Sequence, residues 1–220
     1  MPILNINIPA IATAFYPANA VAQIKSKLAT IKSKYGDIIT NVSSLTNVPE
    51  QIIYSFIFIE SAGQPSIVSY AGAVGLMQVT PATATNVIYH EKKNNRLLAG
   101  EEAILRKHLG TRLDCIFKFK YDNHPLACNN NTGNVVTKED LQKAEFNVLV
   151  GALAIGQLID LHTEGGKVRL DKIVIRYNRG MYYKPKGDTI EETIASVPKE
   201  TKNYVYKLMG KNSLLEILTT

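Results

Sequence analysis

The chain lacks several features that would assign it to common classes of protein. No stretch approaches the ~20 consecutive apolar residues that a bilayer-spanning helix needs, and no low-complexity tract interrupts the sequence. The 25 basic and 19 acidic residues give a net charge of +6 that is spread along the chain. They form no dense basic stripe of the kind that nucleic-acid-binding proteins carry. We therefore expect neither a transmembrane segment nor a nucleic-acid partner.

Cysteine is scarce as well. Cys115 and Cys128 are the only two cysteines, and His108 and His124 lie close to them in sequence. Their spacing is not a standard zinc signature, because zinc ligands usually come in closely spaced pairs. Two separate thiols, a Cys115–Cys128 disulfide and a metal site remain open. The metal site is the least favoured, so the expected function needs no metal and no cofactor.

Apolar residues are plentiful and recur mostly at helical spacing. With 220 residues and 45% hydrophobic content, the chain can bury the core of one domain. The pattern predicts helices in several segments: one from Val21, a second run from Tyr35, and others over 146–161, 170–177 and after Pro198. Period-two strand signals are limited to a possible hairpin near residues 73–79. The sequence therefore predicts a mainly α fold.

Glu60 occupies an unusual position for a carboxylate. After Pro49 apolar residues recur at helical spacing, and Glu60 lies one turn beyond Phe56 on the same stripe. Gly63 and Pro65 supply a stop signal, so we expect Glu60 in the last helical turn. There the helix dipole and apolar neighbours disfavour the ionised carboxylate. A carboxyl that stays protonated near neutral pH suits a general acid, whereas the simpler alternative is a side chain that leans out into solvent.

A glycine-rich segment without acidic residues follows Glu60. Residues 69–78 read SYAGAVGLMQ, and their glycines permit tight turns and close approach of another chain. Residues 61–90 contain neither Asp nor Glu. The segment can therefore form one wall of a cleft, but it offers no second carboxylate.

Four parts of the chain together resemble the soluble lytic transglycosylases, goose-type-lysozyme-like enzymes that cut the glycan of bacterial cell walls. Residues 60–84 look like the signature of the family. Residues 146–151 look like its Asn-Ile-x-x-Gly helix, residues 177–180 like its Tyr-Asn motif, and residues 198–205 like its Glu-Thr-x-x-Tyr-Val close. Several motifs in one order are more specific than a single short motif.

The resemblance implies a mainly α (α+β lysozyme-like) fold, a helical bundle around a glycan cleft with a small β-hairpin. We expect an N-terminal segment and helix over residues 1–34 and a catalytic domain over residues 35–210. An insertion at about residues 86–142 would decorate the cleft or meet a partner, such as a phage-particle or cell-envelope protein. Residues 211–220 are expected to form a C-terminal tail.

The resemblance also implies a role for residues around Glu60, which would be the catalytic residue. Ser61 would hydrogen-bond Glu60 or the glycan, and Tyr177 would lie beside Glu60 with its hydroxyl reaching towards the carboxyl. Arg176 and Arg179 flank the Tyr-Asn motif, where the family usually has small residues. They would either bind carboxylates of the wall or narrow the cleft.

Further residues would contact the substrate by the same analogy. Met77 and Gln78 would line the subsites, and Asn178, Glu200 and Tyr204 would hold the cleft and the muramyl unit. Two of these have simpler alternatives: Met77 as a core residue, and Glu200 as a first-turn residue that the helix dipole favours.

The resemblance implies a mechanism with one carboxyl. Glycosidases ordinarily use two carboxylates, and Glu200 remains a candidate for the second. In the transglycosylases, however, the substrate's N-acetyl group stabilises the reacting centre, and the carboxyl then acts as base on the C6 hydroxyl to leave a 1,6-anhydro sugar. A hydrolytic goose-type lysozyme and a non-catalytic module that binds wall glycan or builds a particle are the alternatives.

The first ten residues lack the basic region and apolar core of a secretory signal peptide. We therefore expect the chain to act at the bacterial cell wall, either after loss of a signal, or as a phage-particle component or a lysis protein that something else helps across the membrane.

Overall fold

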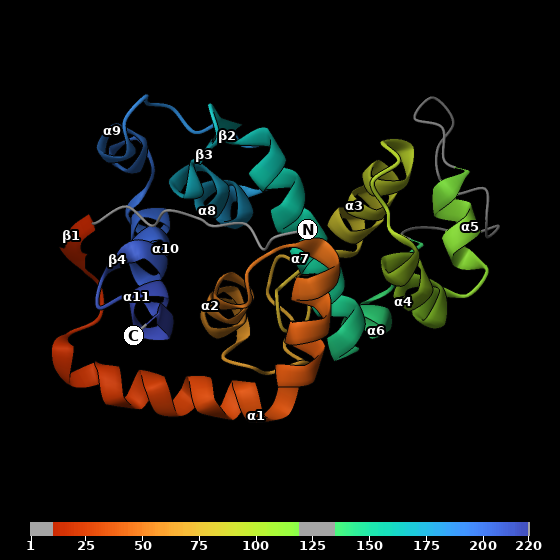
Figure 1. Ribbon diagram of the computed structural model, residues 1–220, viewed down its shortest axis with the longest axis horizontal. Helices are drawn as coiled ribbons and strands as arrows, with labels where there is room; N and C mark the ends of the chain where they lie inside the picture. Colours follow the sequence, from red (N-terminus) through yellow and green to blue (C-terminus); the bar gives the residue numbers. More distant parts are fainter. Residues whose placement is uncertain (1–10, 119–134, 220) are drawn as a thin grey trace.

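Helices account for most of the structure, so the predicted mainly α fold is confirmed. The computed structural model describes residues 11–118 and 135–219 (Figure 1). The strands within these ranges have only two to four residues each. They pair as a parallel β1–β4 ladder and an antiparallel β2–β3 hairpin.

Three helices build the centre of the molecule: α1 (Val21–Thr46), α2 (Glu50–Ser61) and α7 (Ala144–Leu161). By length and composition α7 could cross a membrane, contrary to the expectation from the sequence. The fold gives it another role, because 67% of the helix is buried inside the protein. It packs against α1, α3 and α8, and we interpret it as the core helix of the fold.

The helix α1 contains both apolar runs that the sequence indicated. Figure 1 shows that it bends near its middle, so that one half runs along the edge of the molecule and the other rises beside α7. It ends at Asn47, whose φ of 57° lies in the left-handed region. The helix is continuous across residues 34 and 35, where the N-terminal segment was expected to end. No break in the helix marks the predicted boundary between the N-terminal segment and the catalytic domain, so this boundary stays a prediction.

The glycine-rich segment leads from α2 to α3 (Pro81–Lys93) and contains the expected hairpin in minimal form. Isolated antiparallel bridges join Val74 to Val68 and to Val79. Thr80 then caps α3 by accepting a hydrogen bond from the backbone N–H of Thr83, and Pro81 occupies the first turn.

The described parts of the segment expected as an insertion, residues 86–118 and 135–142, form one side of the molecule. They contain most of α3, then α4 (Ala99–Leu109), α5 (Arg112–Phe117) and α6 (Lys138–Leu141). In Figure 1 these helices lie at the opposite end from α10 and α11.

The C-terminal part places helices beside α2. After β2 (Thr163–Glu164) and β3 (Lys167–Val168) come α8 (Leu170–Arg179), α9 (Ile190–Ala195), α10 (Lys199–Met209), β4 (Gly210–Lys211) and α11 (Leu214–Thr219). The strand β4 pairs with β1 (Ile11–Ala14), which precedes the short 3-10 helix η1 (Ala18–Ala20). The helix α7 ends at Leu161, and Gly165 and Gly166 lie in the turn between β2 and β3.

The last residues do not form the tail that the sequence suggested. Leu214, Leu215 and Ile217 of α11 are buried, and α11 packs against α2 and α10. This burial is long-range packing, which the short apolar run at the end of the sequence does not reveal.

Candidate functional site

Glu60 lies in the last turn of α2, as predicted, and contacts α10. The residue after the helix end, Ala62, has a left-handed φ of 51°. Tyr204 donates a hydrogen bond of 2.5 Å from its hydroxyl to Oε1 of Glu60. One turn before Glu60, the ring of Phe56 packs against Tyr177, with the two centroids 4.5 Å apart. The half-buried carboxyl therefore lies among aromatic rings from α2, α8 and α10.

This environment raises the pKa of Glu60 from its usual 4.5 to about 7. Burial is the main cause, and the hydrogen bond from Tyr204 and the positive charge of Lys207 partly oppose it. At neutral pH the carboxyl therefore exists in both protonation states. It can donate a proton in one step and accept one in the next, which is the property required of a single acid and base.

No second carboxylate accompanies Glu60 in the described part of the chain. The groups that shift its pKa are Tyr204 and Lys207, and no acidic residue is among them. Glu200 is exposed in the first turn of α10, where its charge favours the positive helix end. This position matches the simpler alternative for Glu200 and gives it no visible part in the chemistry of Glu60.

The sequence predicted that the hydroxyl of Tyr177 reaches towards Glu60, but Tyr204 makes this contact. The hydroxyl of Tyr177 donates to the backbone oxygen of Met77 at 2.8 Å, and the hydroxyl that reaches Glu60 belongs to Tyr204. Burial raises the pKa of both tyrosines well above the usual value, and the charge of Glu60 adds to the effect. Tyr177 is thus close to Glu60, but it holds the glycine-rich segment and not the carboxyl.

Ser61 and Met77 face the core and not the cleft. Ser61 is 4% exposed, and its hydroxyl donates to the backbone oxygen of Leu76 at 2.8 Å and not to Glu60. Met77 is fully buried against Gly151, where an added Cβ would come within 2.5 Å of the Met77 sulfur. Both residues fix the position of the segment that follows α2.

Gln78 and Asn178 also make structural contacts. Gln78 has a left-handed φ of 47°, and its amide nitrogen donates to the backbone oxygens of Gly75 and Ile67 at 3.0 and 3.2 Å. Asn178 accepts a hydrogen bond of 2.9 Å from the hydroxyl of Thr201, which joins α8 to α10. Among the described residues expected at the site, Tyr204 is the one that hydrogen-bonds Glu60. Contacts of the others with the substrate stay predictions.

Asn147 supports the site although no role was predicted for it. It is fully buried in α7, and its amide oxygen accepts from the backbone N–H of Met77 at 2.7 Å. Its amide nitrogen donates to the backbone oxygens of Val74 and Leu141, each at 2.8 Å. The signal was present in the sequence, because an asparagine in such an apolar helix requires buried hydrogen-bond partners.

The candidate metal and disulfide residues lie only partly within the described ranges. His108 pairs with Glu145 at 2.7 Å, and Cys115 lies on α5. His124 and Cys128 are outside the described residues, so the pairing of the cysteines stays a prediction. Within residues 11–118 and 135–219 no group of three potential ligands could hold a metal ion.

We expect Tyr204→Phe to raise the pKa of Glu60 further. The lost hydrogen bond favours the ionised carboxylate, so its removal leaves burial less opposed and shifts ionisation to higher pH. Carboxyl chemical shifts followed by NMR across a pH titration would measure the change. Tyr206→Phe, on the same helix, serves as the control and should leave Glu60 as it is. An unchanged titration in Tyr204→Phe would contradict the electrostatic role of this hydroxyl.

Comparisons with known proteins find sequences similar to part of the chain. Residues 37–104 match the family described as "Transglycosylase SLT domain". The chain is 37% identical over 65 residues to "Membrane-bound lytic murein transglycosylase E" of Buchnera aphidicola, which covers 30% of this chain and 29% of that protein. It is 50% identical over 42 residues to "Endo-type membrane-bound lytic murein transglycosylase A" of Klebsiella pneumoniae, which covers 19% of this chain and 21% of that protein.

The matched parts span less than a third of these curated relatives. The family match itself begins in α1, includes Glu60 and the glycine-rich segment, and extends to residue 104 in α4. It therefore includes the first part of the segment that was expected as an insertion.

Proposed function

We propose that this chain, whose residues 37–104 belong to the transglycosylase SLT domain family, is a peptidoglycan lytic transglycosylase. The observation that carries the proposal is the half-buried Glu60, whose pKa of about 7 suits one group that both donates and accepts a proton. The names of the relatives support the same activity. The substrate would be the β-1,4 bond between MurNAc and GlcNAc in wall glycan.

In the proposed reaction, protonated Glu60 donates its proton to the oxygen that bridges the two sugars. The C1–O bond of MurNAc breaks, and the N-acetyl oxygen of the same sugar stabilises the electron-poor C1. Glu60, now a carboxylate, takes the proton from the C6 hydroxyl while that oxygen bonds to C1. The products are a 1,6-anhydro-MurNAc end and a free GlcNAc hydroxyl, and Glu60 recovers its proton without net addition of water.

The absence of a carboxylate among the groups that shift the pKa of Glu60 supports this route over hydrolysis. The C6 hydroxyl and the N-acetyl group belong to the bound sugar and are already oriented, so they compete well against a water that no second base positions. A goose-type lysozyme would use the same acid but release a reducing sugar.

A non-catalytic wall-binding or particle-building module gains nothing from a carboxyl that burial keeps protonated, because desolvating the group costs free energy. Incubation of the purified protein with peptidoglycan separates these functions. Release of soluble fragments supports an enzyme, whereas binding without release would support the module.

The proposed site of action is the bacterial cell wall, and delivery by a phage particle, with contacts through residues 86–142, is a further part of the proposal.

A further inference from the structure

An open pocket of about 530 Å³ is lined in part by α8, the helix that also carries Tyr177, and Glu60 does not line it. Its walls come from α3, the end of α7, the end of α8 and the turn at residues 180–183. Apolar side chains such as Val87 and Leu158 make up much of the surface, and Arg176, Arg179 and His90 provide its basic groups.

The pocket has the chemistry of an anion site with an apolar floor. Among the described residues that line it, none is acidic. The acids nearest in sequence to this lining are Glu91 and Asp160. Glu91 is buried and engaged by Arg96 at 2.8 Å and by Gln157 at 2.7 Å, and Asp160 also pairs with Arg96. Both charges are therefore already paired. A carboxylate attached to a short apolar group would match both the arginines and the apolar wall.

Contacts at both ends hold the loop that closes the pocket. Arg176 donates from Nε to the backbone oxygen of Met181 at 2.7 Å, which folds the turn back onto α8. The guanidinium of Arg179 lies 5.1 Å from the centre of the Tyr183 ring. The pocket wall is therefore ordered before a ligand arrives, which reduces the entropy lost on binding.

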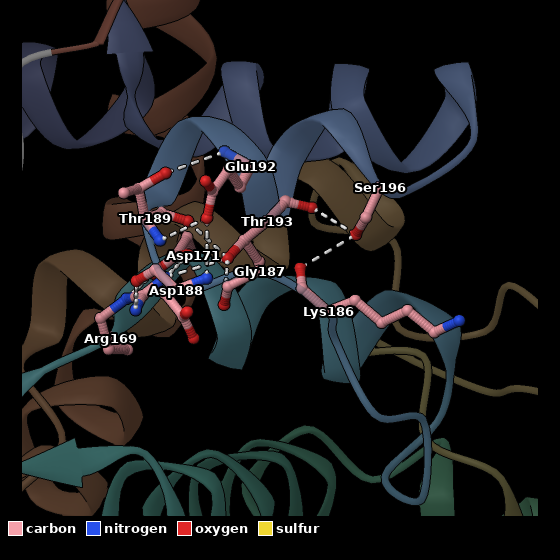
Figure 2. Close-up of polar contacts among 9 residues, drawn as sticks. All are labelled: Arg169, Asp171, Lys186, Gly187, Asp188, Thr189, Glu192, Thr193 and Ser196. Carbon is pink, nitrogen blue, oxygen red and sulfur yellow. Dashed lines mark hydrogen bonds and ion pairs between the residues drawn. The ribbon is translucent and has the colours of Figure 1, made fainter.

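Figure 2 shows what holds the far end of this loop. Arg169 pairs with the buried Asp171 at 2.7 Å and also donates to the backbone oxygen of Asp188 at 2.6 Å. The hydroxyl of Thr193 in α9 accepts from Arg169 at 3.0 Å and donates to the backbone oxygen of Gly187 at 3.3 Å. These contacts join the loop to α8 and α9.

The helix α8 connects the pocket to the catalytic carboxyl. Tyr177 bonds the backbone oxygen of Met77 and is close enough to Glu60 for that charge to raise its pKa. Arg176, the preceding residue, lines the pocket. The same helix therefore contributes Tyr177 to the surroundings of Glu60 and Arg176 to the pocket wall.

We propose that this pocket binds a carboxylate of the short peptide that MurNAc carries, so that the enzyme favours peptide-bearing glycan. The inference rests on the proposed function, because that function supplies the substrate. It accounts for Arg176 and Arg179, which depart from the small residues usual in the family. It also selects between the two roles that the sequence left open for these arginines.

The test compares peptidoglycan strands that carry their peptides with strands from which an amidase has removed them. We expect wild-type kcat/KM to be higher on the peptide-bearing strands, and Arg179→Gln to reduce this preference by roughly threefold to tenfold, as for a charge-assisted hydrogen bond at a partly exposed site. Arg179→Glu should abolish the preference by repelling the carboxylate. Arg179 is exposed, so neither substitution should prevent folding. Lys27→Gln, which removes an exposed charge on α1, serves as the control.

A binding measurement separates this inference from the proposed function. Glu60→Gln protein is titrated with a peptide-bearing disaccharide and with the same disaccharide without peptide. We expect tighter binding of the first ligand and loss of the difference when Arg179→Glu is added. If the wild type cleaves neither strand but the binding difference persists, the proposed function fails and the pocket assignment stands. Equal binding of both ligands, or an equal preference in wild type and Arg179 variants, overturns the pocket assignment.

Discussion

Glu60→Gln lowers the rate of peptidoglycan cleavage by about 10²–10⁴, or further because one group serves both steps. Glutamine keeps the size of the side chain and can still accept the hydrogen bond of 2.5 Å from Tyr204. It cannot donate a proton with comparable acidity, nor accept one from the C6 hydroxyl. Release of soluble fragments from purified peptidoglycan, followed over time, measures the loss.

The same substitution should leave the fold intact and change how stability depends on pH. Because the pKa of Glu60 is raised to about 7, the folded protein keeps a proton that the unfolded chain releases near pH 4.5. Stability therefore falls as pH rises through this window, by up to about 3 kcal/mol for this group. Glu60→Gln removes that loss, so the variant should melt higher than the wild type at pH 7.5.

Glu101 is the reason that a pH dependence should remain in this variant. It is 3% exposed, and burial raises its pKa to about 7 as well. Its contribution to stability therefore also declines as the pH rises.

A Glu60→Gln protein that clears cell walls at the wild-type rate would contradict the assignment of Glu60 as acid and base, and Glu200 would be the next candidate.

Asn147→Leu should destabilise the protein by about 3–5 kcal/mol, because it removes a fully buried hydrogen-bonding network. The leucine side chain has a similar branched shape but is larger, and it leaves unpaired the N–H of Met77 and the carbonyls of Val74 and Leu141. For a chain of this size the loss corresponds to a fall of roughly 6–20 °C in melting temperature. The glycine-rich segment should also become more accessible to protease.

Asn41→Leu is the matched control, because Asn41 is an exposed asparagine on α1. Thermal denaturation of both variants at one pH compares them directly, and the control should change by less than about 0.5 kcal/mol. If Asn147→Leu has the same melting temperature as the wild type, the hydrogen bonds of Asn147 do not hold the glycine-rich segment in place. Gly75 also packs closely against Asn147: a Cβ at Gly75 would lie 2.4 Å from the amide nitrogen of Asn147. A side chain at position 75 should therefore disturb the same contact.

Local patterns in the sequence were sufficient to place the carboxyl of Glu60, the proposed acid and base. An apolar stripe that ends in Glu60, followed by stop signals, predicted its position in the last turn of α2 and its raised pKa. Helical spacing likewise predicted α7, α8 and α10, because each helix buries one face whose period is visible in the chain.

The partners of that carboxyl depend on how distant helices cross, which no local pattern encodes. Tyr177 and Tyr204 are both aromatic residues on faces that turn inward, and their order in the sequence does not reveal which hydroxyl reaches Glu60. The crossing of α8 and α10 against α2 gives Tyr204 that contact and gives Tyr177 the backbone oxygen of Met77. The partner of Ser61 could not be predicted for a related reason, since the carbonyl of Leu76 is fifteen residues away on the returning segment.

Elements that pair the two ends of the chain were also beyond prediction. The strand β1 pairs with β4 through Ile11 and Gly210, and each strand is too short to carry a period of its own. The helix α11 has only six residues, but tertiary packing against α2 buries its leucines. Such short elements gain their stability from the fold and not from local propensity.

Mass spectrometry of the products that the purified protein releases from peptidoglycan tests the central claim most directly. A single acid and base acting on the C6 hydroxyl predicts muramic-acid ends in the 1,6-anhydro form, lower in mass by one water than those of a lysozyme digest. The wild type should yield these ends as the main product. Reducing muramic-acid ends as the dominant product would contradict the account and assign the chain to the hydrolytic lysozymes.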